Sequence, residues 1–334
     1  MSLKLFFHSV SLAKIIIIII NTKKITTFAN KKNAMTAPII IFAYNRPAHL
    51  RRLIDSLLQN AECADTDLII YADGAKAAGD ANVDAVKDVI KKIDGFKSVT
   101  PIFRKKNIGL AANIIDGVTS TINQYGAAIV LEDDLVATPH FIKYMQGALD
   151  YYKDTDAFSI AGYTPKVEVP TDYNYATYAV MRNCSWGWAT WQDRWNRVDW
   201  DVKDFADFFA NDNAVNDFNQ AGNDLSTMLL KQQKGLIGSW SIRFCYTAFR
   251  LQMPTIYPIK SFVINGGADG SGSNVGNTSK YQTVTMDTLN EIRFCDDLAT
   301  NPEILKSFRR TYDTSLLRRV INFGKRLIWK LSPR

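Results

Sequence analysis

The sequence predicts an α/β fold in which helices flank a mostly parallel sheet. Apolar runs of strand length at 38–44, 68–72 and 127–131 alternate with segments of helical periodicity. A run that is apolar throughout is typical of a strand buried on both faces of a parallel sheet. Because such strands alternate with helices, we expect this sheet to occupy residues 36–162.

Apolar residues in helical spacing follow each predicted strand. The first strand is followed by Leu50, Leu53, Ile54, Leu57 and Leu58, and the second by the segment 83–93. A short strand at 100–103 is followed by Ile108, Ala111, Ile115, Val118, Ile122 and Tyr125. The strand 127–131 is followed by Phe141, Met145, Leu149 and Tyr152. Residues three and four positions apart share one face of a helix, so each helix can bury that face against the sheet. The alternation ends after Gly162, and we expect residues 163–300 to form a smaller C-terminal subdomain that completes a cleft.

Composition places the chain among ordinary globular proteins. Of its 334 residues, 47% are hydrophobic and 22% are charged, which excludes a disordered chain, collagen and a coiled coil. The chain has three histidines and four cysteines without a CxxC pair, which argues against a multi-histidine metal site and a dense disulfide framework. We therefore expect reduced thiols, a cytoplasmic protein, and carboxylates as the ligands of any metal.

The net charge of +7 is concentrated at the two ends of the chain. Residues 1–34 carry six lysines and no acid, and residues 304–334 carry nine basic residues and one acid, so the remainder has a net charge of −7. An acidic body argues against nucleic acid as a partner. The leader 1–34 contains an isoleucine run that is too short to span a bilayer, and we predict that the leader is not part of the fold, with a weak signal anchor as the alternative.

The C-terminal tail, residues 304–334, interleaves apolar and basic residues. This mixture predicts an amphipathic helix that lies on an anionic membrane surface, and the alternative is a helix docked on the body. Membrane attachment would make the protein peripheral at the inner face of a bacterial cytoplasmic membrane, close to lipid-linked acceptors.

Polar clusters follow three of the predicted strands, at the sheet edge where open α/β sheets bind ligands. They are Asn45-Arg46, Asp73-Gly74 and Glu132-Asp133-Asp134. The strands are followed by neither GxGxxG nor GxxxxGK[ST], so a phosphate must be held in another way. Adjacent carboxylates at a strand end can hold Mg²⁺ or Mn²⁺, which prefer oxygen ligands and share them with phosphates. The alternative for the acidic triplet is a solvated turn.

Four segments in this order, PIIIFAYNRP, IIYADG, KKNIGLAANI and VLEDDLVATPHF, resemble the GT-A nucleotide-diphosphosugar glycosyltransferases. They are most similar to the N-acetylglucosaminyltransferase I group and to bacterial sugar transferases with an EDD motif, over about residues 37–275. The resemblance implies an inverting, Mn²⁺- or Mg²⁺-dependent transfer of a hexosyl or N-acetylhexosaminyl group from a UDP-sugar to a glycan or lipid-linked saccharide, in bacterial surface polysaccharide synthesis. A sugar-nucleotide nucleotidyltransferase and a sugar-binding scaffold without a catalytic base are the alternatives.

The resemblance also implies roles for individual residues. Those that would contact the nucleotide-sugar are Arg46, Asp73, Asn107, Glu132, Asp133 and Ser271. Asp134 would be the direct metal ligand. Trp186 and Trp188 would lie on the acceptor side of the cleft, with an aromatic core as the alternative. The glycine-rich loop 266–272 would close over the donor and contribute Ser271 and Asp269.

The general base is the point at which the chain departs from the resembled family. An inverting transferase needs a group that accepts the proton of the acceptor hydroxyl. The family has an acid near the tryptophan that matches Trp240, and this chain has no acid in the segment 238–243. Asp269 is our candidate for the catalytic base, and Glu168 is the second candidate.

Overall fold

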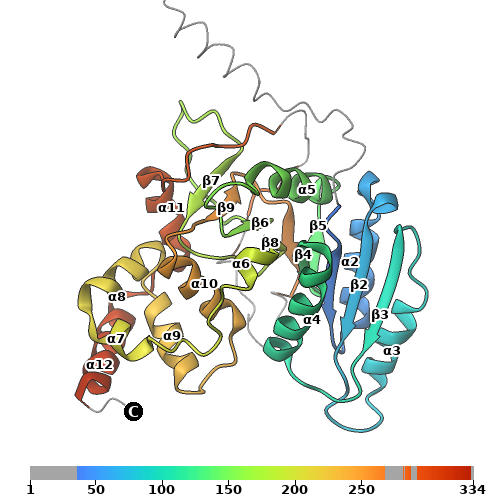
Figure 1. The fold of residues 1–334 in the computed structure, drawn as a ribbon, viewed down its shortest axis with the longest axis horizontal. Helices are drawn as coiled ribbons and strands as arrows, with labels where there is room; N and C mark the ends of the chain where they lie inside the picture. Colours follow the sequence, from blue (N-terminus) through green and yellow to red (C-terminus); the bar gives the residue numbers. More distant parts are fainter. Residues whose placement is uncertain (1–35, 268–280, 282, 287–291, 332–334) are drawn as a thin grey trace, which may run out of the picture. The chain divides into compact units, whose positions relative to one another are not determined.

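The strands expected at 38–44, 68–72, 100–103 and 127–131 are parallel neighbours in one sheet (Figure 1). The structure, a computed structural model, describes residues 36–267, 281, 283–286 and 292–331. The sheet has the strand order β3-β2-β1-β4-β8-β6-β9-β7, and β5 pairs with β10 in a separate antiparallel ladder. The predicted α/β class is therefore confirmed.

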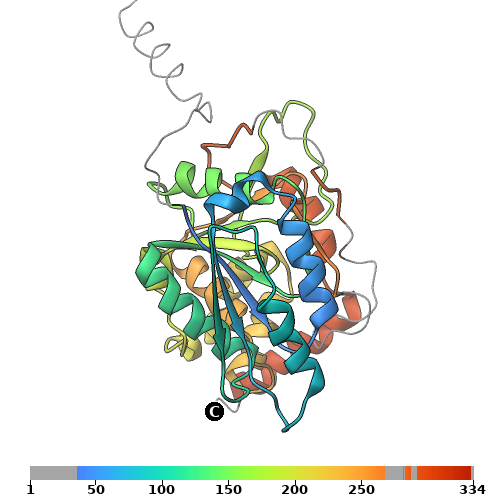
Figure 2. The same cartoon turned by 90° about the vertical axis from the view of Figure 1, so that its right-hand side faces the viewer.

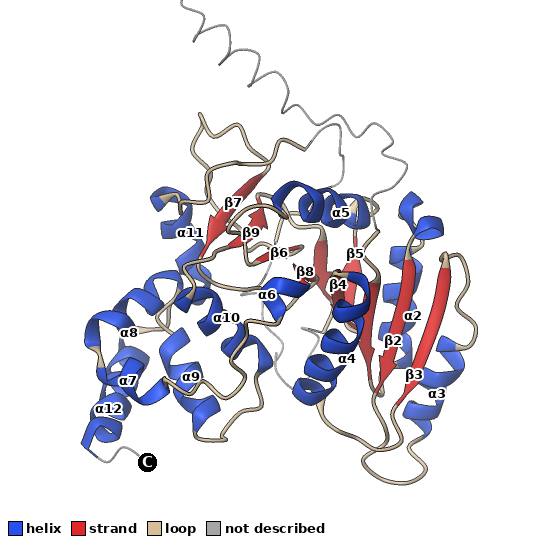
Figure 3. Ribbon diagram, viewed as in Figure 1, coloured by secondary structure: helices blue, strands red, loops and turns tan. Residues whose placement is uncertain are grey.

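The described strands alternate with helices in the first half of the chain (Figure 3). The strands are β1 Ile39–Ala43, β2 Asp67–Ala72, β3 Ser98–Phe103, β4 Ala127–Glu132, β5 Leu135–Ala137, β6 Ser159–Ala161, β7 Thr177–Val180, β8 Trp188–Trp191, β9 Thr255–Pro258 and β10 Val263–Asn265. The α-helices are α2 Pro47–Leu57, α3 Ala81–Ile90, α4 Leu110–Tyr125, α5 Phe141–Tyr152, α6 Gln192–Trp195, α7 Phe205–Ala210, α8 Asp212–Phe218, α9 Leu225–Gln233, α10 Trp240–Arg250, α11 Pro302–Tyr312 and α12 Leu316–Leu331. Short 3₁₀ helices lie at Ala61–Asp65 and Asn219–Ala221.

Apolar side chains cover both faces of the sheet, as continuous apolar strands require. On one face, Ile39 and Ile41 of β1 belong to a cluster with residues of α2, α3 and α5. On the other face, Ile40 and Phe42 belong to a second cluster with residues of α4 and α10. Figure 2 shows the strands running between these helices. The alternation along β1 thus produces three layers.

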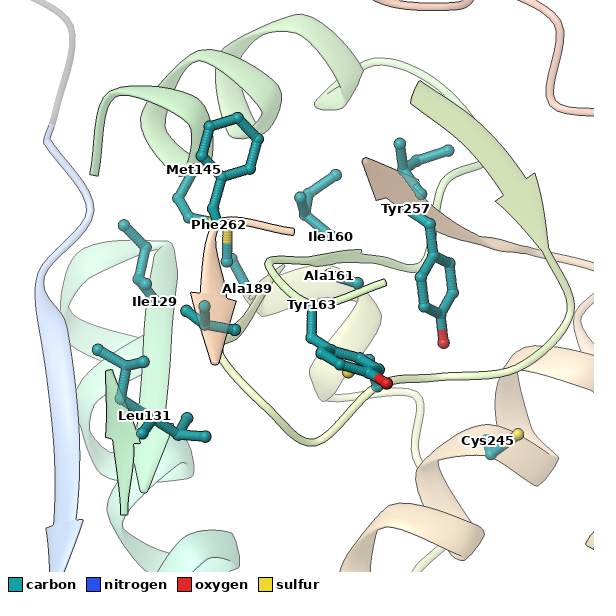
Figure 4. Packing of buried hydrophobic residues seen from close by; sticks show 14 of the residues in the cluster. Ile129, Leu131, Met145, Ile160, Ala161, Tyr163, Ala189, Cys245, Tyr257 and Phe262 are labelled. Carbon is teal, nitrogen blue, oxygen red and sulfur yellow. The ribbon is translucent and has the colours of Figure 1, made fainter. Parts of the chain in front are cut away.

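The first cluster continues from the parallel strands into the antiparallel half of the sheet. Figure 4 shows Ile129 of β4, Ile160 of β6 and Ala189 of β8 together with Met145 of α5 and Phe262. These side chains come from segments far apart in the sequence, and all five are fully buried. The core therefore joins the two halves of the sheet.

Both sides of the boundary that we predicted at residue 162 contribute strands to one sheet, and the division into two subdomains stays a prediction. Strands β7, β8 and β9 come from the predicted second subdomain, yet they pair in the same sheet as β4 and β6. Contacts divide the chain only into Met1–Met35 and Thr36–Arg334. The change near residue 162 is one of topology, from parallel strands to a mixed arrangement. The leader 1–34 lies outside the described residues.

The C-terminal tail contains two helices that differ in their packing. In α11, Ile304 and Phe308 are buried, and the Phe308 ring contacts Tyr178 of β7 and Tyr257 of β9. The first part of the tail is therefore docked on the body, which was the alternative to the membrane-bound helix. In α12, most of the large apolar side chains are exposed.

Candidate functional site

The three predicted polar clusters meet at one edge of the sheet because the strands that carry them are parallel and in register. Ala43 of β1 lies opposite Ala72 of β2, and Phe42 lies opposite Glu132 of β4. The ladder continues past the strand ends, where the backbone N–H of Asp73 donates to Ala43 O at 2.8 Å. The residues that follow these strands therefore share the ligand-binding edge that open α/β sheets use.

Asp73 organises the loop that precedes α4. Its Oδ1 accepts hydrogen bonds from the backbone N–H of Gly74 at 2.9 Å and Ile108 at 3.0 Å, and its Oδ2 accepts one from Gly109 at 3.0 Å. Asn107 of the same loop donates from Nδ2 to Gly74 O at 2.9 Å. Asp73 and Asn107 thus lie together at this edge, each holding backbone, and their contact with a nucleotide stays a prediction.

Arg46 and Asp134 form an ion pair between the loops that follow β1 and β4. The distance from Arg46 Nη1 to Asp134 Oδ2 is 3.1 Å, and each side chain is about one-fifth exposed. The segment after β10 lies against Asp134, since Gly266 N donates to the backbone carbonyl of Asp134 at 2.8 Å and a Cβ at Gly267 would overlap its carboxylate oxygen Oδ2. Asp134 is therefore in contact with the start of the glycine-rich loop.

The surroundings of Glu132 and Asp133 disfavour the charged forms of both side chains. Burial, followed by the charge of Asp134, raises the pKa of Glu132 from 4.5 to about 8. The same causes raise the pKa of Asp133 from 3.8 to about 7, although Asp133 Oδ2 accepts a hydrogen bond from Tyr44 N at 3.2 Å. Two carboxyls of the triplet therefore retain protons near neutral pH when no other cation is present.

The acidic triplet fits a metal held by one protein carboxylate and by substrate oxygens. Among the described residues, no three His, Cys, Asp or Glu side chains converge as ligands of one ion. Asp133 is directed to the backbone of Tyr44, whereas Asp134 faces Arg46. Mg²⁺ is commonly bound through one or two carboxylates together with phosphates and water, so this donor set is chemically adequate.

A second candidate site is a cavity of about 140 Å³ on the antiparallel side of the sheet. It is lined by Arg182, Asn183, Cys184, Ser185, Trp186, Leu225, Met228, Ser241, Ile242, Tyr281 and Tyr312. The Asn183 Nδ2 atom is buried and has no hydrogen-bond partner among the described residues. Burial raises the pKa of the Cys184 thiol, and Glu132 adds a smaller contribution in the same direction, so this wall of the cavity lies near the acidic triplet.

Arg182 is a fixed part of the cavity wall. Its guanidinium donates to both carboxylate oxygens of Asp224, at 2.8 and 3.0 Å, and lies 3.8 Å from the ring centroid of Tyr312. Its backbone carbonyl accepts a hydrogen bond from Tyr257 Oη at 3.0 Å. A bidentate, buried arginine pair of this kind gives the cavity a defined shape.

The structure separates the two tryptophans that we expected on the acceptor side. Trp186 is partly buried, lines the cavity and packs edge-on against Tyr163. The prediction for Trp188 is wrong, because its side chain is 2% exposed and stacks on Trp195 and Trp240 in the core. Between the two tryptophans, Gly187 has φ of +60°, a conformation that interrupts the alternation of a strand.

The candidates for the catalytic base and the lid remain predictions. Asp269 and Ser271 lie outside the described residues. Glu168 is at the surface, where its carboxylate pairs with Arg310 of α11, and this pairing lowers its pKa. Ser241, in the acid-free segment around Trp240, lines the cavity.

Sequence reasoning missed two features that shape these sites. Gly74 is needed because a Cβ there would overlap the backbone of Lys106, so it allows the loops after β2 and β3 to meet. The dipeptide Asp-Gly after a strand was the available signal. Arg182 lies in a segment of irregular pattern, and no local motif marked its pairing with Asp224, 42 residues away.

Comparison with known proteins agrees with this architecture. The sequence profile of glycosyl transferase family 2 matches residues 39–210, which is more than half of the chain. The parallel sheet and this match define a glycosyltransferase of the GT-A fold that uses a nucleotide-sugar. The chain belongs to glycosyl transferase family 2.

Solved structures that are similar to parts of this chain include a mannosyltransferase and a cytidylyltransferase, and no curated protein sequence matches it. A mannosyltransferase from Pyrobaculum calidifontis, in complex with GDP-Man and Mn²⁺, has 14% identity and a TM-score of 0.34, and the match covers 47% of this chain and 45% of that one. A cytidylyltransferase from Leptospira borgpetersenii has 12% identity and a TM-score of 0.33, with coverage of 50% and 64%. The chain thus spans less than two thirds of either protein.

No helix among the described residues has both the length and the apolar character needed to cross a membrane. The four cysteines, Cys63, Cys184, Cys245 and Cys295, are free and buried, which agrees with the expectation of reduced thiols.

Proposed function

We propose that this glycosyltransferase transfers a hexosyl or N-acetylhexosaminyl group from a UDP-sugar, with inversion, to a glycan or lipid-linked saccharide of a bacterial surface polysaccharide. The observation that carries the proposal is the Arg46–Asp134 pair beside Glu132 and Asp133, at the ligand edge of the sheet. A cationic group and adjacent carboxylates at this edge suit a metal-bound diphosphate.

In this proposal Asp134 is the protein ligand of Mn²⁺ or Mg²⁺, and Arg46 contacts the diphosphate. The divalent ion, when bound, offsets the charge of the nucleoside diphosphate as it leaves. Asp73 and Asn107 hold the loop before α4 at the position of the nucleotide, since both fix backbone there. Glu132 and Asp133 contact the sugar and the ribose, as their place at the end of β4 allows.

The acceptor saccharide occupies the cavity lined by Trp186 in this proposal. An indole face offers apolar area for a sugar ring, and the buried Asn183 amide supplies hydrogen-bonding groups for a hydroxyl. The base that takes the acceptor proton is assigned to Asp269. The predicted smaller subdomain, 163–300, then corresponds to the acceptor side of the same compact unit.

The first test is a screen of UDP-sugars by thermal shift with Mn²⁺ present, followed by measurement of UDP release with and without saccharide acceptors. A ligand that binds only the folded protein raises its stability. Asp134→Asn should weaken metal-dependent UDP binding at least about tenfold, about 1.4 kcal/mol. Asp84→Asn, at an exposed position on α3, is the matched control.

Three outcomes would contradict the proposal. Unchanged UDP affinity and unchanged Mn²⁺ dependence in Asp134→Asn would show that the metal site is misplaced. Release of pyrophosphate would favour a nucleotidyltransferase. Binding of a sugar nucleotide without any turnover would favour a sugar-binding scaffold.

A further inference from the structure

Helix α12 packs on the body through a face that contains Trp329 and Arg326, and it exposes most of its large apolar side chains. Trp329 is buried between Phe205 and Phe209 of α7, and Arg326 pairs with Asp212 at the start of α8. Figure 1 shows α12 beside these two helices, far from β3. An amphipathic helix of a globular protein normally buries its apolar face, so this arrangement is reversed.

The exposed face of α12 consists of two adjacent apolar stripes. Seven large apolar side chains are between 41% and 73% exposed; they are Leu316, Leu317, Val320, Ile321, Phe323, Leu327 and Ile328. Four of them, at 316, 320, 323 and 327, repeat at helical spacing and form one stripe, and those at 317, 321 and 328 lie beside it. A continuous exposed apolar surface of this kind marks a site of interaction.

Basic side chains border this apolar face on both sides. By helical geometry, Arg318 and Lys325 lie along one margin and Arg319 along the other. All three are exposed, and the sequence of α12 contains no acidic residue. Long basic side chains at the margin of an apolar face can extend toward lipid headgroups while the apolar residues enter the acyl region.

We propose that α12 is an interfacial helix that holds the enzyme on an anionic lipid bilayer, with its apolar stripes in the membrane and Arg318, Arg319 and Lys325 at the headgroups. A second copy of the chain is the competing occupant. If two copies paired through this face, the basic residues at its margins would come together, and α12 has no acidic residue to offset their charge. An anionic lipid surface, in contrast, complements these basic residues. The proposal depends on neither the donor nor the metal.

The test is co-sedimentation of the full chain with phosphatidylcholine vesicles, with and without about one third phosphatidylglycerol. We expect binding to the anionic vesicles that weakens with added salt. Phe323→Asp should reduce that binding at least about tenfold. The matched control is Leu236→Asp, since Leu236 is 69% exposed, as Phe323 is, but precedes α10. Both sites are exposed, so neither change should alter the melting temperature.

Charge reversal tests the contribution of the basic side chains separately from that of the apolar face. Arg318→Glu with Lys325→Glu should reduce binding to anionic vesicles at least about tenfold, whereas Lys91→Glu with Lys92→Glu, just after α3, should reduce it far less. The proposal is overturned by absence of binding at low salt, or by equal binding to neutral and anionic vesicles. A stable dimer in lipid-free solution that Phe323→Asp dissociates would assign the face to a second copy.

Discussion

The acidic triplet makes the stability of the fold depend on pH in a direction opposite to that of ordinary carboxylates. Asp133 and Glu132 have pKa values of about 7 and about 8 in the folded chain, against 3.8 and 4.5 for unperturbed groups. Between these values the unfolded chain has lost protons that the folded chain retains. The free energy of unfolding should therefore fall as pH rises from about 4.5 to about 8, and level off above.

The size of the effect follows from the change in pKa. For Asp133 alone, a rise from 3.8 to about 7 corresponds to an upper bound of about 4 kcal/mol, at about 1.4 kcal/mol per pKa unit. Water entry at high pH reduces this figure, and we expect about 2 kcal/mol for the triplet, or about 4 °C in melting temperature. A divalent cation bound at Asp134 should offset most of this loss, because it replaces the protons.

The measurement compares melting temperatures at about pH 5.5 and about pH 8.5, in EDTA and in Mg²⁺. Asp134→Asn is the informative variant, since the Asp134 charge is the second cause of both raised pKa values. We expect it to reduce the loss of stability at high pH and to abolish the pH-dependent part of the Mg²⁺ effect. Asp84→Asn removes an exposed charge and should leave both unchanged.

Other titrating groups change the stability of the parent and of the variants by the same amount. The difference in melting-temperature loss between the parent and Asp134→Asn therefore reports on the acidic triplet. If Asp134→Asn and the parent lose the same stability between the two pH values, the repulsion argument fails. A Mg²⁺ effect of equal size at both pH values would show that protons and metal do not compete for these oxygens.

Three further predictions concern neighbouring positions. Gly267→Ala should weaken metal-dependent UDP binding more than it lowers the melting temperature, because the added methyl group overlaps the carboxylate of Asp134, the proposed metal ligand. If calorimetry shows the same UDP affinity in this variant and in the parent, the prediction is wrong. Asp73→Ala should cost about 3 kcal/mol in urea unfolding, since three backbone N–H groups lose a charged acceptor. Trp188→Ala should cost about 3 to 5 kcal/mol as a core truncation. Trp186→Ala should change stability much less and weaken acceptor binding, and the reverse order would refute the assignment of the two tryptophans.

The parallel half of the fold could be predicted from local sequence because each strand there is apolar throughout. Ile39 to Ala43 and Leu68 to Ala72 are buried on both faces, and residues in register follow them at one edge. The juxtaposition of Arg46 with Asp134 follows from that register. The antiparallel half could not be predicted in this way, because β6, β7 and β10 are three or four residues long and pair with distant segments.

The two tryptophans show how a single glycine can change the side-chain orientation that strand alternation predicts. Trp186 and Trp188 are two positions apart, which in a regular strand places both side chains on one face. The positive φ of Gly187 breaks that period, so Trp186 packs beside the first core cluster and Trp188 enters the second. A glycine between two aromatic residues does not reveal from sequence whether it takes this conformation.

The Arg46–Asp134 pair supports the proposal that this edge binds a diphosphate without a preformed metal cage. One guanidinium faces three carboxyls, and it offsets only part of their charge, since the pKa values of Glu132 and Asp133 remain raised. The remaining charge is offset either by protons on these two carboxyls or by a metal. In the proposed donor complex, the Asp134 carboxylate would hold a divalent ion, and the Arg46 guanidinium would donate to the diphosphate oxygens. If the donor binds as proposed, one set of charge contacts would replace another at the same residues, and we expect binding to release protons from Glu132 and Asp133.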